Sequence, residues 1–364
     1  MAAYTKRLKQ DLDRWVTRGL VDRSTADALL ADAVSQDRRS LSFGFVLMMM
    51  AALLLGAAVL LVVASNWEAI PRLTRVVLLF CLIFVGYVGG ALLKLRGHDA
   101  LAEGAWLIAA ATFGGAIALI GQMYHLSGDE EAALLTWFGG TLLAAAVLRS
   151  GPLTIGAGGI AVFWMVAKGF DLWSGGDLSR AYPIVAALVW AVSLWTGSSY
   201  ARHLVALSLV LYAVVLAFHY DVTAVSLVLA GVSALLFAVA VLDPKRTEQI
   251  VRLDGRLDMH ALIGFLTGAA MLQFDHMEET ATLVLAAVIV FAAIIAALLL
   301  AGRESRGLRW IAYLGFTFEL CFLYVTTLGT MLGTAGLFLA SGVVLALIAL
   351  LIIRVERRMN LRAA

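Results

Sequence analysis

The stretch IGQMYHLSGDEEAALLTW, residues 120–137, places hydrogen-bonding and titrating side chains between two apolar runs. Gln122, Tyr124 and His125 come at the end of the first run, and Asp129 follows with two glutamates. A histidine that titrates near neutral pH beside carboxylates can coordinate a cation, relay protons or bind a polar ligand. The alternative is a solvated loop, because a short outer loop without Lys or Arg holds acids by default.

A second polar stretch, SNWEAIPR, follows the first long apolar run and contains Asn66, Trp67 and Glu68. If the first and third apolar runs pack together as helices, Asn66 and Glu68 can hydrogen-bond to Gln122 or His125. The two stretches then form an outward-facing polar site beneath a tryptophan, or a rigid latch between two loops.

A short internal likeness links two of these features. Gln273 and His276 in QFDH match Gln122 and His125 in QMYH, and paired acids follow both. Equivalent positions in two parallel halves are found in some transporters. Because the flanking residues do not align and the later apolar run is shorter, a chance likeness is the alternative.

Glu319 lies near the middle of an apolar run, in GFTFELCFL. An ionised carboxylate there costs on the order of 3 kcal/mol on insertion scales. We therefore expect Glu319 to be protonated, to face the bundle interior or to have a partner. It is the best intramembrane candidate for proton coupling or ligand contact, and a neutral acid bonded to a neighbouring helix is the purely structural alternative.

Metal and catalytic chemistry have less support. His125, His219 and His276 are expected on the same side of the membrane, but no ligand pair has the close spacing of a motif such as HExxH. The sequence has no phosphate-binding loop and no nucleophile elbow. We predict no metal, no cofactor and no catalytic residue; an enzyme acting through His125 with Asp129 or Glu131 is the minority alternative.

The elements that must position these residues follow from composition. Of the 364 residues, 62% are apolar and 14% charged, whereas soluble domains have roughly 45–50% and about 25%. The apolar blocks approach the roughly 20 residues that a helix needs to cross the hydrocarbon. The sequence predicts an all-α fold, a polytopic transmembrane helix bundle. The twelve expected spans are 43–64, 76–93, 101–121, 132–148, 153–168, 181–196, 203–218, 222–242, 259–274, 280–301, 310–327 and 331–353.

Lysine and arginine are unequally distributed over the loops between these spans. With the N-terminus inside, 23 of the 27 basic residues fall on the inner side. Cytoplasmic loops carry such an excess, and omitting one span would exchange the sides of everything after it. We therefore predict that both termini are cytoplasmic and that the polar stretches described above face outward.

The chain is expected to divide into a cytoplasmic amphipathic helical hairpin (1–42), a transmembrane helical domain (43–353) and a basic cytoplasmic tail (354–364). Gly19 should end the first helix of the hairpin, and Ser24 should open the second within a capping box. The hairpin is too small to bury a core alone. It is therefore expected to pack on the membrane domain, lie on the lipid surface or dock a partner.

The motifs ASNWEAIPR, LIGQMYHLSGD and RGLVDRSTADALL resemble a family of predicted bacterial membrane proteins, domain of unknown function 2157. The resemblance is best over about residues 5–165. It implies a multi-pass protein of the bacterial inner membrane with an N-terminal cytoplasmic hairpin, and it implies no particular activity.

We therefore expect a transporter or a small-molecule or ion binding protein with a polar site at the outer face. A continuous polar path between the faces would favour transport. The alternative is a non-catalytic membrane scaffold or envelope sensor that docks a partner protein through an apolar face of the hairpin. The expected partners are the lipid bilayer and such a protein, with no nucleic acid. The expected ligand-binding residues are Asn66, Trp67, Glu68, Gln122, Tyr124, His125, Asp129, Gln273, His276 and Glu319.

Overall fold

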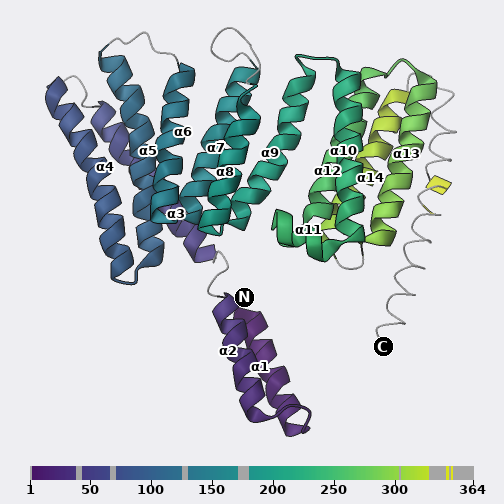
Figure 1. Ribbon diagram of the computed structural model, residues 1–364, viewed down its shortest axis with the longest axis horizontal. Coiled ribbons are helices and arrows are strands. Elements are labelled where there is room, and N and C mark those ends of the chain that lie inside the picture. Colours follow the sequence, from purple (N-terminus) through teal and green to yellow (C-terminus); the bar gives the residue numbers. More distant parts are fainter. Residues whose placement is uncertain are drawn as a thin grey trace. The chain divides into compact units, whose positions relative to one another are not determined.

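The computed structural model describes residues 2–37, 43–65, 71–124, 130–170, 180–302 and 305–327, with Gly342, Val343 and Ala346 as isolated positions. These residues form helices and no strand (Figure 1). The helices are α1 (Ala2–Thr17), α2 (Arg23–Asp37), α3 (Phe43–Ser65), α4 (Arg72–Leu95), α5 (Asp99–Met123), α6 (Glu130–Leu148), α7 (Gly151–Gly169), α8 (Tyr182–Thr196), α9 (Ser199–Ala217), α10 (Val222–Leu242), α11 (Pro244–Val251), α12 (Leu257–Asp275), α13 (Thr280–Leu300) and α14 (Arg306–Thr327). The all-α prediction is confirmed for this part of the chain.

Nine helices within the described ranges are long and apolar enough to cross a membrane: α4 to α7, α9, α10 and α12 to α14. Two further predicted spans coincide with helices, α3 and α8, and α8 has only 15 residues. The predicted twelfth span, 331–353, lies outside the described residues except at three isolated positions. The structure therefore supports a multi-pass helical membrane protein, with fewer clear spans than the predicted twelve.

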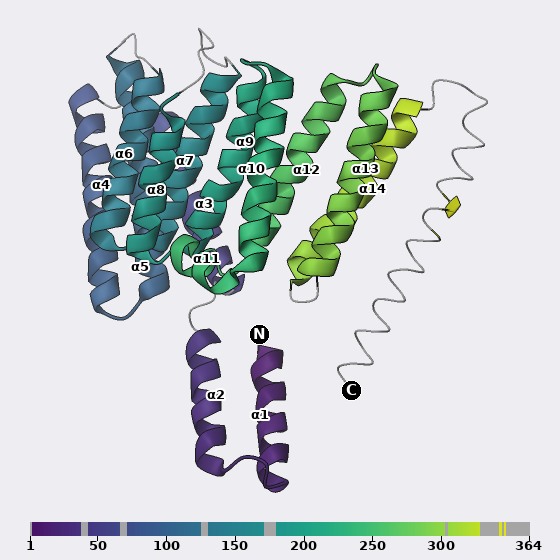
Figure 2. The same cartoon turned by 45° about the vertical axis from the view of Figure 1, so that its right-hand side comes forward.

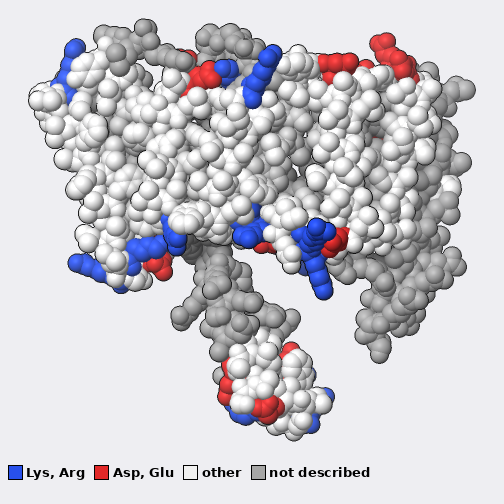
Figure 3. All heavy atoms as spheres, viewed as in Figure 1, with Lys and Arg blue, Asp and Glu red and all other residues white. Residues whose placement is uncertain are grey.

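Charge and proline both mark the helix ends. On the face drawn in Figure 3, Lys, Arg, Asp and Glu lie at the ends of the apolar helices, and the surface between those ends is uncharged. Pro71 precedes α4, and Pro152, Pro183 and Pro244 lie in the first turns of α7, α8 and α11. Proline is tolerated there because the first N–H groups of a helix have no intrahelical acceptor. Each of the four prolines thus lies in the first turn of a helix or directly before it.

The chain divides into two compact units, residues 1–156 and 157–364. In the first, α5 packs against α3, α4 and α6. A Cβ atom added to Gly90 of α4 would lie 2.5 Å from the Trp106 ring of α5. Trp106 Nε1 donates to the Tyr87 carbonyl at 3.1 Å, and Trp137 Nε1 of α6 donates to the Ala110 carbonyl at 2.8 Å. Two indoles thus attach α4 and α6 to α5.

Glu103, near the start of α5, is a buried acid of the first unit. Lys94 Nζ lies 3.0 Å from its carboxylate, and the Ser150 hydroxyl donates to it as well. A buried carboxylate needs such partners. Glu103 therefore tethers the end of α4 and the start of α7 to α5.

In the second unit, α12 contacts α10 on one side and α13 and α14 on the other (Figure 2). Gly264 and Gly268 allow the close approach of α12 to α10. A Cβ atom on Gly268 would lie 2.9 Å from both the Ala230 nitrogen and the Ser226 oxygen. Small residues four apart allow membrane helices to pack backbone against backbone.

The N-terminal residues form the predicted hairpin, α1 and α2. Gly19 has a φ of +68° and follows the first helix, as expected for a helix end. The predicted capping residue was wrong. Asp22, not Ser24, precedes α2, and its carboxylate accepts from the Thr25 N–H at 3.2 Å and from the Ser24 hydroxyl.

Candidate functional site

The predicted outer-face site is only partly within the described residues. Asn66, Trp67, Glu68, His125 and Asp129 all lie outside them. Gln122 lies in the last turn of α5 and Tyr124 directly follows the helix, and both side chains are exposed. The expected hydrogen bonds between these two stretches of chain remain a prediction.

The structure brings together two residues that the sequence singled out separately. Gln273 of α12 donates through Nε2 to Glu319 Oε1 of α14 at 2.6 Å. Both side chains are buried, and Gln273 Oε1 has no hydrogen-bond partner among the described residues. Glu319 thus faces the interior of the second unit and has a partner on a neighbouring helix, two of the outcomes expected for it.

His276 follows Gln273 by one turn but belongs to a different environment. Its Nδ1 lies 3.2 Å from the Leu272 carbonyl and 3.7 Å from the Asp275 carboxylate. That carboxylate also accepts a hydrogen bond from the Thr223 hydroxyl of α10 at 2.6 Å. Gln273 is buried, whereas its counterpart Gln122 is exposed. The likeness between the two motifs therefore does not extend to the surroundings of the glutamines.

His219 also bonds within its own segment, with Nδ1 3.1 Å from the Val215 carbonyl. Among the residues that the structure describes, no three His, Cys, Asp or Glu side chains are placed to hold a metal ion. His125 lies outside those residues.

A long groove lies within the second unit, between α9 on one side and α10 and α12 on the other, with a volume of about 810 Å³. Its walls are almost entirely apolar, with Ala213 and Leu216 on α9 and Val228 and Val232 on α10. The charged lining residues and the lining histidine lie near its two ends. One end has Arg180, Tyr220 and Asp221, and the other has His260. The groove offers no continuous polar path, but it can hold an elongated apolar molecule.

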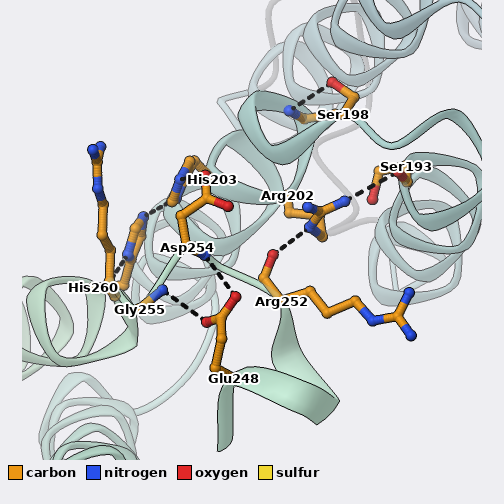
Figure 4. Close-up of polar contacts among 11 residues, drawn as sticks. Ser193, Ser198, Arg202, His203, Glu248, Arg252, Asp254, Gly255 and His260 are labelled. Atoms are coloured by element: carbon orange, nitrogen blue, oxygen red, sulfur yellow. Dashed lines mark hydrogen bonds and ion pairs between the residues drawn. The ribbon is translucent and has the colours of Figure 1, made fainter. Parts of the chain in front are cut away.

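The His260 end of the groove adjoins a polar cluster (Figure 4). His203 of α9 and His260 of α12 stack with ring centroids 5.0 Å apart, and His203 Nδ1 lies 3.3 Å from His260 Nε2. His260 Nδ1 lies 2.7 Å from the Arg256 carbonyl, and His203 Nε2 lies 3.7 Å from Asp254 Oδ2. Four groups therefore form one continuous chain from the Arg256 carbonyl to the Asp254 carboxylate.

The loop that carries Asp254 is held by side chains of its neighbours. Glu248 of α11 accepts from the N–H groups of Asp254 at 3.0 Å and Gly255 at 2.7 Å. Arg202 of α9 donates through Nε to the Arg252 carbonyl at 2.6 Å. Arg252 and Asp254 both have a φ of 54°, a left-handed conformation that non-glycine residues rarely adopt unless their surroundings enforce it.

The sequence did not indicate this cluster. His203 and His260 are 57 positions apart and share no motif. One signal was present, because both lie at the predicted inner ends of their spans, 203–218 and 259–274. The distribution of basic residues predicts one side of the membrane for the outer histidines and the other side for these two. It does not show that the helices carrying His203 and His260 pack together.

The comparisons with known proteins concern the first unit almost entirely. No curated protein and no solved structure matches the chain. Residues 13–154 match a family model described as "Predicted membrane protein (DUF2157)". That range covers both the hairpin motif and the span motifs on which the resemblance was based, and the apolar helices α4 to α6 lie within it. The predicted similarity to this family of membrane proteins is thus confirmed for residues 13–154.

Proposed function

We propose that the protein binds an elongated, largely apolar molecule, such as the acyl chain of a membrane lipid, in the groove of its second unit. The observation that carries this proposal is the groove itself. Its volume of about 810 Å³ lies within the roughly 300–1,000 Å³ of small-molecule sites. The apolar walls match a hydrocarbon chain, and the polar groups at the ends suit an amphipathic molecule.

The length of the groove supports the same class of ligand. Its lining on α10 extends from Ala224 to Leu236, which at a rise of 1.5 Å per residue is about 18 Å. The hydrocarbon core of a bilayer is about 30 Å thick. The acyl chains of one leaflet span about half of that thickness, which is comparable with the length of the groove.

Native mass spectrometry of the full-length protein tests the proposal. The protein would be extracted from vesicles of phosphatidylethanolamine and phosphatidylglycerol in a mild detergent. We expect one lipid molecule to remain bound. Leu236→Trp, which fills the groove, should abolish its retention. Both side chains are exposed, but Leu236 lines the groove and the adjacent Leu235 does not.

Leu235→Trp is therefore the matched control, and it should retain the lipid as the unchanged protein does. Absence of any bound lipid in the unchanged protein would contradict the proposal. Equal retention in both tryptophan variants would contradict it too, because the lipid would then be bound elsewhere.

A second candidate function is binding of a small molecule or ion at the outer face, with transport as its extension. The exposure of Gln122 and Tyr124 at the end of α5 supports this proposal, since ligand-binding groups must be accessible. Thermal stability in detergent, measured with ions and small metabolites between pH 5 and 8, tests it. A ligand that stabilises the unchanged protein but not Gln122→Ala/His125→Ala would support a site at this position.

The alternative of a scaffold or sensor is supported by the hairpin, where Trp15, Leu20 and Leu29 are exposed apolar residues. We propose that this hairpin and both termini lie on the cytoplasmic side of a bacterial inner membrane. The distribution of basic residues supports the orientation, and the family resemblance supports the compartment.

A further inference from the structure

We propose that His203 and His260 form a proton-binding site that takes up a single proton, on Nε2 of His203, facing Asp254. The site stands on its own geometry. Only its effect on a ligand in the groove rests on the function proposed above.

The hydrogen-bond chain fixes which nitrogens carry protons. A carbonyl only accepts, so the 2.7 Å contact with the Arg256 carbonyl requires a proton on His260 Nδ1. His260 Nε2 is then an acceptor in the neutral ring, and His203 Nδ1, 3.3 Å away, must be the donor. In the neutral pair, His203 Nε2 is therefore unprotonated.

This neutral arrangement leaves one unfavourable contact. The lone pair of His203 Nε2 lies 3.7 Å from a carboxylate oxygen of Asp254. A proton placed there turns this repulsion into an ion pair. A proton placed on His260 Nε2 would instead oppose the N–H of His203. The pair therefore has one place for one proton.

The other charged groups near the pair bond to the backbone or lie further along the same loop. Glu248 already accepts two backbone N–H groups, and Arg202 donates to the carbonyls of Arg252 and Ser193. Arg256 follows Asp254 in the same loop, and Asp258 lies in the first turn of α12, where it accepts from the Met259 N–H at 2.8 Å. The Asp254 carboxylate is the acid in contact with His203.

Proton uptake has a structural consequence for the 252–256 loop. Asp254 belongs to this loop and His203 to α9, so the ion pair holds the loop against α9. Val251, Leu253 and His260 line the inner end of the groove. If the groove holds an apolar chain, a proton on His203 closes that end over it.

Nuclear magnetic resonance of the full-length protein in lipid nanodiscs, with nitrogen-15-labelled histidine, tests the site between pH 5 and 8.5. At high pH we expect both rings to carry their proton on Nδ1. On acidification, the pair should take up one proton, on His203 Nε2. Asp254→Asn should weaken proton binding roughly tenfold, as expected for loss of an opposite charge within about 4–6 Å.

His219→Gln is the control, because His219 lies just after α9 and its Nδ1 contacts the Val215 carbonyl at the end of that helix, so it should leave the titration of the pair unchanged. Two protons taken up independently would overturn the proposal. A proton on Nε2 of neutral His203 would overturn it as well.

Hydrogen exchange of the 252–256 amides provides a readout of loop closure. After correction for the intrinsic effect of pH, protection should rise on acidification in the unchanged protein and not in Asp254→Asn. If acidification changes the protection of these amides equally in the unchanged protein and in Asp254→Asn, the proposed closure of the loop is wrong. Leu236→Trp should keep the histidine titration while losing bound lipid, so failure of the groove and failure of the proton site are distinguishable.

Discussion

At the scale of residues, the pairing of Gln273 with Glu319 shows how a polar interaction can be accommodated inside an apolar bundle. A glutamine amide and a neutral carboxylic acid can form two hydrogen bonds in a ring, since each group has one donor and one acceptor side. The structure has one of these bonds, at 2.6 Å, and leaves Gln273 Oε1 for the other. Burial in hydrocarbon favours the neutral acid.

We predict that Glu319→Gln preserves the stability of the protein and that Glu319→Ala lowers it. The amide introduced by the first substitution can form the same ring with Gln273, whereas alanine leaves Gln273 buried without a partner. An unsatisfied buried polar group costs about 1–3 kcal/mol. Thermal unfolding in detergent measures the effect, with exposed Glu278→Ala as the control. Equal losses in both variants at position 319 would show that the pair needs a charge.

The cap of α2 gives a prediction on pH. The pKa of Asp22 is lowered from 3.8 to about 2, because the Ser24 and Thr25 hydroxyls and the Thr25 N–H donate to its carboxylate. A lowered folded-state pKa stabilises the helix above about pH 4, and this contribution is lost as the pH falls through 4 towards 2. Asp22→Ala should therefore increase amide hydrogen exchange at the start of α2 at pH 6. In this variant, lowering the pH should destabilise the start of α2 less than it does in the unchanged protein. Asp27→Ala, which removes only a 3.9 Å ion pair with Arg23, should change neither.

At the scale of elements, the sequence predicted the helices better than their packing. Hydrophobic length alone located eleven of the helices. α11 was missed because it has eight residues and a polar composition. The pairing of α9 with α12 was not predictable, because membrane helices lack a hydrophobic force between them that the sequence pattern would reveal. The His203–His260 contact depends on that pairing.

Two glycines of the second unit provide a matched test of helix packing. A methyl group on Gly268 would lie 2.9 Å from the backbone of α10, whereas one on Gly231 would have no atom within 4 Å. Gly268→Ala should lower stability by about 1–3 kcal/mol, the range for overpacking. Gly231→Ala should be neutral or slightly stabilising. Denaturation in mixed micelles measures both, and similar effects would show that α10 and α12 are not closely packed.

At the scale of the whole molecule, the predicted orientation depends on loops rather than on packing. Lys245 lies at the start of α11 and Glu278 lies after α12, and both are exposed. The charge distribution assigns the first to the cytoplasm and the second to the outside.

We predict that a membrane-impermeant maleimide labels Glu278→Cys in intact cells and labels Lys245→Cys only after lysis. The native Cys81 and Cys321 would first be replaced by alanine to remove background labelling. The reverse pattern would invert the topology, and labelling of both in intact cells would mean that α12 does not cross the membrane.

The buried contact between α12 and α14 also bears on the order of biogenesis. Glu319 follows Gln273 by 46 positions, so at about 5–20 residues per second its synthesis comes some seconds later. During that interval α12 has a glutamine without its native partner, and lipid cannot provide one. We therefore expect α12 to stay near the insertion machinery, or near water at the membrane surface, until α14 arrives.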